Sequence, residues 1–319
     1  MSSPILRLVA GRVALGVGLL FAVSVLIFAG TQILPGDVAQ SILGQSATPT
    51  ALANLRTELG LDEPAVSRYL SWLGGVLRGD LGTALSSGQD IATSIGERLG
   101  NTLFLAFWAA AVSVPLAIGL GLLAVRYRDG AIDKLISGFA LAATSLPEFF
   151  VGYALVYFFA VQWQLFPGIS TVYEGMPFAE RMRAIALPAT VLTLVVLAHM
   201  MRMTRAAILN VMQSAYVETA ELKGLSALRV IGRHALPNAI SPIVNVVMLN
   251  LAFLVVGVVV VEVIFVYPGM GQYLVDHVAK RDVPVVQAVG LIFAAVYIAL
   301  NTVADIASIV ANPRLRHPK

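Results

Sequence analysis

The stretch AISPIVNVVMLNLAFLVVGVVVVEVIFV, residues 239–266, decides the fold class of this chain. It contains one charged residue, Glu262. A helix needs about 20 mostly apolar residues to cross the hydrocarbon core of a bilayer. Residues 239–266 therefore predict a membrane-spanning helix.

Five other stretches meet the same criterion: 13–31, 101–125, 135–161, 187–203 and 285–310. Hydrophobic residues make up 58% of the 319 positions and charged residues 12%, against roughly 25% charged in soluble domains. The composition thus predicts an all-α membrane protein with six transmembrane helices. A cleaved signal peptide is the alternative for the first stretch, but its small-residue triplet, residues 22–24, lies in the middle of the apolar run.

Basic residues are distributed unevenly between the two sides of this topology. With the N-terminus in the cytoplasm, 13 of the 21 basic residues fall on the inner side, and the inner segments carry a charge near +9 against −3 outside. Inner loops of membrane proteins are enriched in Lys and Arg. Both termini are therefore predicted to be cytoplasmic. The chain divides into a first segment with one span (1–31), a long folded extracytoplasmic loop (32–100) and a five-span core (101–319).

Two amphipathic stretches in the long loop, 51–60 and 66–77, predict short helices. The second carries Tyr69 and Trp72. Three arrangements remain open for it: packing against the spans, lying on the outer leaflet, or docking an external partner.

A charged segment, about 215–237, precedes the fifth span and predicts a helix–turn–helix. Gly224 stands where a helix C-cap needs positive φ, and Ser226 is a suitable N-cap for the second helix. Pro237 can occupy the first turn of the span that follows. Such a pair on the cytoplasmic side is suited to binding a soluble protein in a groove.

This segment resembles the EAA loop of ATP-binding-cassette import permeases. Glu218, Ala220, Gly224 and Leu236-Pro237 stand at the spacing of that motif, whereas Thr219 replaces Ala and His234 replaces Ile. The variant at His234 and a set of motifs along the chain resemble the first permease of the dipeptide/oligopeptide importer family. Those motifs are residues 34–37, 58–62, 77–82, 145–147, 261–262, 267–271 and 312–316, where Asn312 stands in place of the usual Asp.

The resemblance implies a role and a set of partners. The chain would form a translocation pathway in the bacterial inner membrane with a second related permease, as a heterodimer. Two cytoplasmic ATPase subunits would use ATP and Mg, and an extracytoplasmic solute-binding protein would deliver substrate. The coupling loop would comprise Glu218, Ala220, Gly224, Ser226, His234, Leu236 and Pro237. That family branch handles dipeptides, oligopeptides, glutathione, nickel complexes and sugar derivatives, so the resemblance selects no single substrate.

The residues themselves indicate no catalytic site. The chain has no cysteine, no phosphate-binding loop, no Gly-x-Ser-x-Gly and no His-Glu-x-x-His. No bound cofactor, metal or nucleic acid is expected, and energy must come from a partner or an ion gradient. A secondary transporter is therefore the alternative function, although no internal repeat supports it; an intramembrane enzyme is a third.

Polar residues inside the apolar spans are functional candidates, because burying them in lipid is costly. Glu148 and Asn250 are possible pathway residues. Glu148 follows Pro147 in mid-span, where a broken helix would line a cavity. Glu262 is a third candidate, or else reaches the membrane interface. Asp305, near the inner end of the last span, is expected to pair with Arg314 or Arg316.

Overall fold

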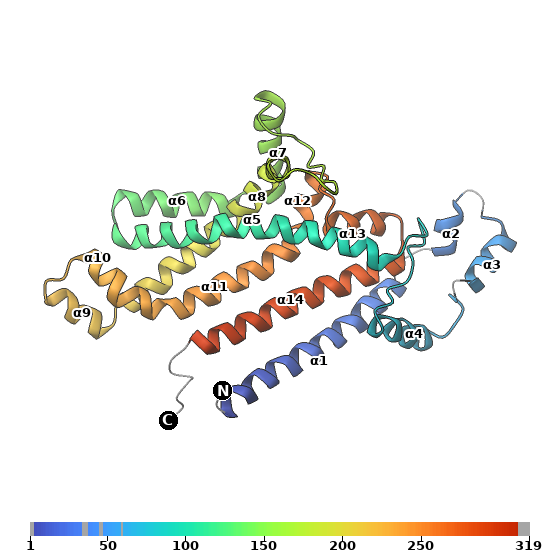
Figure 1. The fold of residues 1–319 in the computed structure, drawn as a ribbon, viewed down its shortest axis with the longest axis horizontal. Helices are drawn as coiled ribbons and strands as arrows, with labels where there is room; N and C mark the ends of the chain where they lie inside the picture. Colours follow the sequence, from blue (N-terminus) through green and yellow to red (C-terminus); the bar gives the residue numbers. More distant parts are fainter. Residues whose placement is uncertain (1–2, 34–37, 45–46, 59, 312–319) are drawn as a thin grey trace.

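The computed structural model describes residues 3–33, 38–44, 47–58 and 60–311. These residues form helices and loops, with one isolated β-bridge between Thr83 and Asp90. The long helices run side by side along the molecule, with α2–α4 at one end and α9 and α10 at the other (Figure 1). By length and composition, five helices in the described part can cross a membrane, or six if one bent pair counts as a span.

The five unbent spans lie where the apolar stretches predicted them. They are α1 (Ser3–Ile33), α5 (Ile91–Arg126), α8 (Phe178–Met212), the continuous run from Ala227 to Ile264 that contains α11 (Leu236–Gly257) and α12 (Val259–Ile264), and α14 (Val283–Ala311). Helix α5 begins ten residues before the predicted start because Asp90 caps it. The Asp90 Oδ1 accepts hydrogen bonds from the backbone N and the Oγ1 of Thr93, both at 2.7 Å. These bonds lower the pKa of Asp90.

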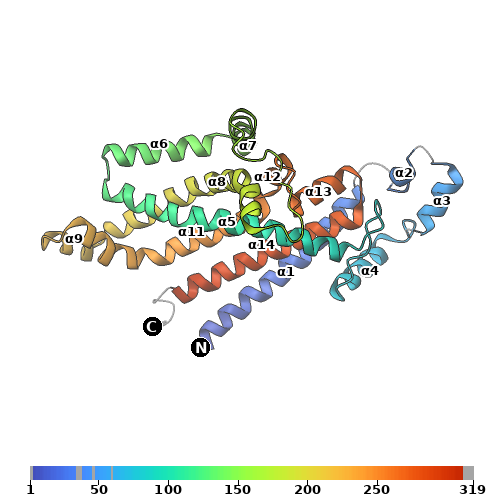
Figure 2. The ribbon, with the colours of Figure 1, turned by 45° about the horizontal axis from the view of Figure 1, so that its top comes forward.

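The third span, predicted over residues 135–161, is sharply bent. Helix α6 (Ala131–Ser145) is followed by α7 (Glu148–Leu155) and the π-helical η2 (Val156–Gln162), bent from it by 99°. The sharp turn is visible where α7 leaves α6 (Figure 2). Pro147 disfavours helical backbone at the residue before it, and Leu146 is extended, with ψ at 130°. The break expected beside Glu148 is therefore present, but it redirects the chain.

The core lies between α5, α8 and the α11–α12 run. Leu105, Val191, Met200, Leu254 and Phe265 are among its fully or almost fully buried side chains.

A buried ion pair joins α6 to α8 at the end of the bundle nearest α9. Arg205 donates to both carboxylate oxygens of Asp133, from Nε at 2.9 Å and from Nη2 at 2.7 Å. Asp133 is 4% exposed. Arg205 is one of the basic residues on the predicted inner side, and its guanidinium here forms a two-point contact that joins two helices.

Helix α14 lies beside α1 and is held to it by polar contacts near both ends. Arg12 forms an ion pair of 3.0 Å with Asp305, and Gln287 donates to the Thr31 hydroxyl at 2.7 Å. Asp305 thus pairs with Arg12, while its predicted partners Arg314 and Arg316 lie outside the described residues. The motif residues 34–37, 59 and 312–316 lie outside them as well.

In its described residues, the long loop after α1 contains three short α-helices: α2 (Val38–Leu43), α3 (Pro49–Glu58) and α4 (Ala65–Leu77). Helix α4 packs against α1 through an aromatic cluster of Phe28, Tyr69 and Trp72, whose ring centroids are 5.3–6.1 Å apart. The Tyr69 hydroxyl also lies 2.8 Å from the Ser24 Oγ. Of the three arrangements considered for this stretch, packing against a span accounts for its aromatic side chains.

Candidate functional site

The predicted helix–turn–helix is present at one end of the bundle. It consists of α9 (Ala215–Leu222), a turn, α10 (Ala227–Arg229) and the π-helical η3 (Val230–Ala235), which runs directly into α11. We call residues 215–235 the cytoplasmic hairpin, after the side on which the sequence places them. Figure 1 shows it extending beyond the long helices.

The turn of the hairpin has the geometry that Gly224 predicted. Gly224 has φ of +75°. Its N–H bonds the Glu221 carbonyl at 2.8 Å, and the Leu225 N–H bonds the Ala220 carbonyl at 3.4 Å. This pair of bonds is a Schellman motif, which ends a helix with a left-handed residue.

The two halves of the hairpin are held together by a small apolar cluster. Val217, Ala220 and Val230 are buried, with Leu225 packed against them. Ala220 is 5% exposed, so a larger side chain there would separate the helices. Close packing of the two helices therefore explains why this chain has a small residue, Ala220, at this position of the motif.

The start of the second hairpin helix differs in part from the prediction. Ser226 occupies the N-cap position, and its carbonyl accepts from the Arg229 and Val230 N–H groups at 2.8 and 3.0 Å, but its side chain makes no capping hydrogen bond. Pro237 lies in the first turn of α11, as predicted. The π-helical turn precedes it because the proline ring crowds the carbonyl four residues back.

The remaining motif residues lie at or near the surface. Glu218 is exposed, His234 and Leu236 are partly buried, and the His234 carbonyl accepts from the Asn238 Nδ2 at 2.9 Å. Two leucines that the motif does not include are also exposed: Leu222 by 83% and Leu228 by 69%. Apolar residues that protrude among charges at the tip of a polar hairpin favour a protein partner. The spacing of the motif does not point to either leucine.

The three pathway candidates lie apart from this hairpin. Glu148 is partly buried at the break between α6 and α7. Asn250 is buried, and its Nδ2 donates to the Val246 carbonyl of its own helix at 2.8 Å. Glu262 is fully buried and does not reach the chain's surface.

Glu262 is the centre of a hydrogen-bonded junction between α5, α12 and α13 (Met270–Ala279). Thr102 donates to its Oε1 at 2.6 Å, and the Gly271 and Gln272 N–H groups donate to its Oε2 at 2.7 and 3.1 Å. The Thr102 hydroxyl accepts in turn from the Met270 N–H at 2.9 Å. The carboxylate thus caps the N-terminus of α13, where negative charge is stabilised.

A neighbouring set of contacts extends this junction to α8. The Tyr267 hydroxyl donates to the Asn101 carbonyl at 2.8 Å, and the Asn101 Nδ2 donates to the Pro268 carbonyl at 3.0 Å. Arg181 donates to the Asn101 Oδ1 at 2.9 Å and lies over the Phe104 ring. These hydrogen bonds could not be predicted from the sequence, because their partners are 80 to 167 positions apart.

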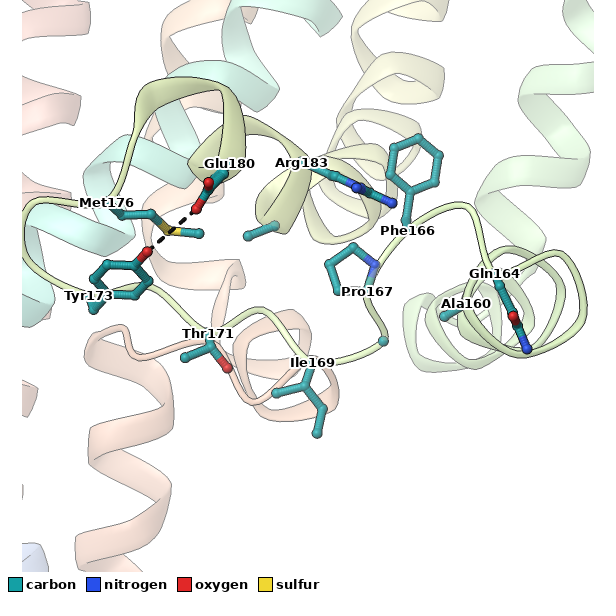
Figure 3. A pocket seen from close by; sticks show the side chains of 12 residues that line it. Ala160, Gln164, Phe166, Pro167, Ile169, Thr171, Tyr173, Met176, Glu180 and Arg183 are labelled. Atoms are coloured by element: carbon teal, nitrogen blue, oxygen red, sulfur yellow. Dashed lines mark hydrogen bonds between the residues drawn. The ribbon is translucent and has the colours of Figure 1, made fainter.

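A cavity of about 620 Å³ lies where η2, the loop after it and the start of α8 meet (Figure 3). Glu180 and Arg183 line it with Tyr173, whose hydroxyl donates to the Glu180 Oε2 at 3.4 Å. None of the three pathway candidates lines this cavity. Among the described residues, no group of three or more His, Asp or Glu side chains is placed to hold a metal ion.

Comparison with known proteins identifies the family. Residues 88–317 match the family of binding-protein-dependent transport system inner membrane components, and residues 5–106 match the N-terminal region of such components. The chain belongs to this family. It is thus a permease subunit and a multi-pass protein of the bacterial inner membrane.

Relatives of this permease align over almost their whole length. A probable peptide ABC transporter permease of Sinorhizobium fredii is 33% identical over 96% of this chain and 98% of the relative. A putative peptide transport system permease of Brucella abortus is 35% identical, over 97% and 99%. The dipeptide permease DppB of Escherichia coli K12 is 33% identical, over 98% and 100%. These relatives place the permease in the dipeptide/oligopeptide branch of the ABC importers.

Proposed function

We propose that this permease forms half of a pathway for peptides and is driven by ATPase subunits that dock on its cytoplasmic hairpin. The observation that carries the proposal is the hairpin itself: a hydrogen-bonded polar turn with two protruding leucines, in a chain of the permease family. The names of the relatives support peptides as the substrate class. ATP and Mg would be bound by the ATPase partners, and this chain would bind no cofactor directly.

The proposed topology has six spans, with α6 and the α7–η2 pair counted as the third. Both termini and the cytoplasmic hairpin face the cytoplasm, and residues 32–100 face outward ahead of the core at 101–319. In Figures 1 and 2, the start of α1 and the late part of α14 point toward the end that carries α9, while α2–α4 lie at the opposite end. This arrangement is the one that the topology requires.

Within the hairpin, each motif residue has a proposed role in coupling. Glu218 offers a charge to the ATPase, Ala220 keeps the two helices close, and Gly224 and Ser226 shape the turn. His234, Leu236 and Pro237 join the hairpin to α11. A shift of the docked ATPases would thus move α11 as a unit with η3, in the manner of a rigid-body switch.

The pathway itself is proposed to run between this permease and a second, related one, fed by a solute-binding protein outside. Glu148 is the candidate best placed for it, because this partly buried acid adjoins exposed, non-helical backbone at Leu146 and Pro147. Asn250 and Glu262 are buried within this chain. They would reach the pathway only when the surrounding helices move apart.

We expect the double substitution Leu222→Asp and Leu228→Asp to abolish capture of the ATPases. Burial of each leucine contributes roughly 1.5–3 kcal/mol, so co-purified ATPase should fall at least about tenfold. The measurement is the amount of ATPase that co-purifies with a tagged permease expressed together with its transport system, in mild detergent.

Leu77→Asp is the matched control, because Leu77 is 80% exposed at the opposite end of the molecule. It should leave the co-purified ATPase at the wild-type level. Equal capture by the wild type and the Leu222/Leu228 variant would refute docking on this hairpin.

The topology predicts opposite labelling of two engineered cysteines. Because the chain has no native cysteine, Ser87→Cys and Ser226→Cys each provide one thiol at an exposed position. A membrane-impermeant maleimide added to intact spheroplasts should label Ser87→Cys, and should label Ser226→Cys only after the membrane is opened. Labelling of Ser226→Cys in intact spheroplasts would place the hairpin outside and out of reach of a cytosolic ATPase.

A further inference from the structure

The α7–η2 pair, residues 148–162, forms an arm with two different faces. Figures 1 and 2 show α7 standing away from the long helices. One face packs against the rest of this chain: Val151, Leu155, Val156 and Phe159 contact the main core. The opposite face is exposed at a spacing of four residues, by 53% at Phe149, 60% at Tyr153, 51% at Tyr157 and 58% at Val161.

Contact with water is unfavourable for this exposed face. Between residues 135 and 179 the only charged side chains are Glu148 and Glu174. A contiguous aromatic surface of this kind, without charges, marks a contact with protein or lipid.

Contact with lipid alone is unfavourable for the base of the arm, residues 146–148. The 15 residues of α6 place the break about 22 Å from the inner end of the span, within a hydrocarbon core of about 30 Å. Leu146 and Pro147 are exposed and non-helical, and Glu148 beside them carries a carboxylate. Irregular backbone at membrane depth is tolerated only against protein or a water-filled cavity.

The size of the exposed face fits one protein partner. Six aromatic side chains on the arm and just after it are 48–60% exposed: Phe149, Phe150, Tyr153, Tyr157, Phe158 and Trp163. At about 200 Å² for each ring side chain, they leave roughly 600 Å² open. A standard interface buries about 800 Å² per partner.

We propose that the outer face of the arm is the surface on which the second permease docks, with the break at residues 145–148 left facing the aqueous pathway between the two chains. This inference rests on the proposed function. Among the partners named there, only the second permease lies in the bilayer, where an uncharged aromatic face has to be covered. Glu148 then meets water at the junction of the two permeases.

The test is site-specific photo-crosslinking in native membranes that contain the complete transporter. In the test variant, Tyr153 is replaced by p-benzoylphenylalanine, a side chain of similar shape. In the matched control, the same substitution is made at Leu155, which lies on the face of the same helix that packs against the core. Irradiation at position 153 should give a product with the mass of two permeases, whose peptides map to two permease chains. Position 155 should give at least several-fold less of it.

Three outcomes would overturn the proposal: adducts of position 153 with lipid alone, adducts with the solute-binding protein, or no excess of product over position 155. These results are separable from failure of the proposed function, because peptide uptake and ATPase capture are measured in the same membranes. If the transporter imports peptide and binds its ATPases but gives no crosslink at position 153, docking of the second permease on the arm is refuted and the proposed function is not.

Discussion

Gly224→Val is expected to reduce peptide uptake at least about tenfold while the permease still inserts at a normal level. Gly224 has φ of +75°, a conformation that costs an ordinary residue roughly 1–2 kcal/mol and is worse for a β-branched one. Nothing lies within 4 Å of a Cβ built at this position. The effect therefore comes from backbone strain, which depopulates the turn that the ATPase would recognise.

Two controls separate strain from size. Gly224→Asn should retain most uptake, because Asn tolerates the left-handed region. Gly232→Val, in the same hairpin but outside that region, has open space around its Cβ and should change uptake far less than Gly224→Val. Uptake is measured as accumulation of a labelled dipeptide, with permease quantified in the same membranes. Wild-type uptake by Gly224→Val would contradict the coupling role of the hairpin.

Gly271→Ala is expected to damage folding rather than coupling. A Cβ at Gly271 would lie 2.6 Å from the Val259 Cα and 3.0 Å from the Glu262 Oε2. Because the first of these atoms is backbone, no side-chain rotation relieves the clash. Overpacking of this kind costs roughly 1–3 kcal/mol, occasionally more. The apparent melting temperature in detergent should fall by roughly 1–5 °C, with a lower yield of monodisperse protein.

Gly96→Ala is the matched control, since a Cβ at that helical position meets nothing within 4 Å. It should leave the melting temperature unchanged or slightly higher, because alanine reduces the freedom of the unfolded chain. If Gly271→Ala melted like Gly96→Ala, the close packing of α13 on the Glu262 junction would not be a determinant of stability.

Local features of the sequence were sufficient to predict the hairpin. Gly224 and Pro237 act on backbone within a few residues, so their consequences can be read from the chain itself. The five unbent spans followed from apolar length for the same reason. The bend at Pro147 was only half predicted, because a proline marks where a helix breaks, whereas the direction of the next helix depends on what it packs against.

Contacts between distant residues could not be predicted from one sequence. Glu262 was visible as an acid in an apolar span, but its partner Thr102 lies 160 positions away. Arg205 appeared to be an inner-side anchor until the fold brought it to Asp133. In both cases residue type indicated that a partner was needed, and only tertiary packing identified it.

Helix α8 connects the cavity to the cytoplasmic hairpin. Its 35 residues, about 52 Å at 1.5 Å each, begin beside the cavity lined by Glu180 and Arg183 and end at Met212, two residues before the cap of α9. The cavity end and the hairpin end therefore belong to one continuous helix, which contains Pro188, rather than to separate segments joined by loops. Movement of the hairpin by docked ATPases would therefore be transmitted to the cavity along a single helix, without an intervening loop.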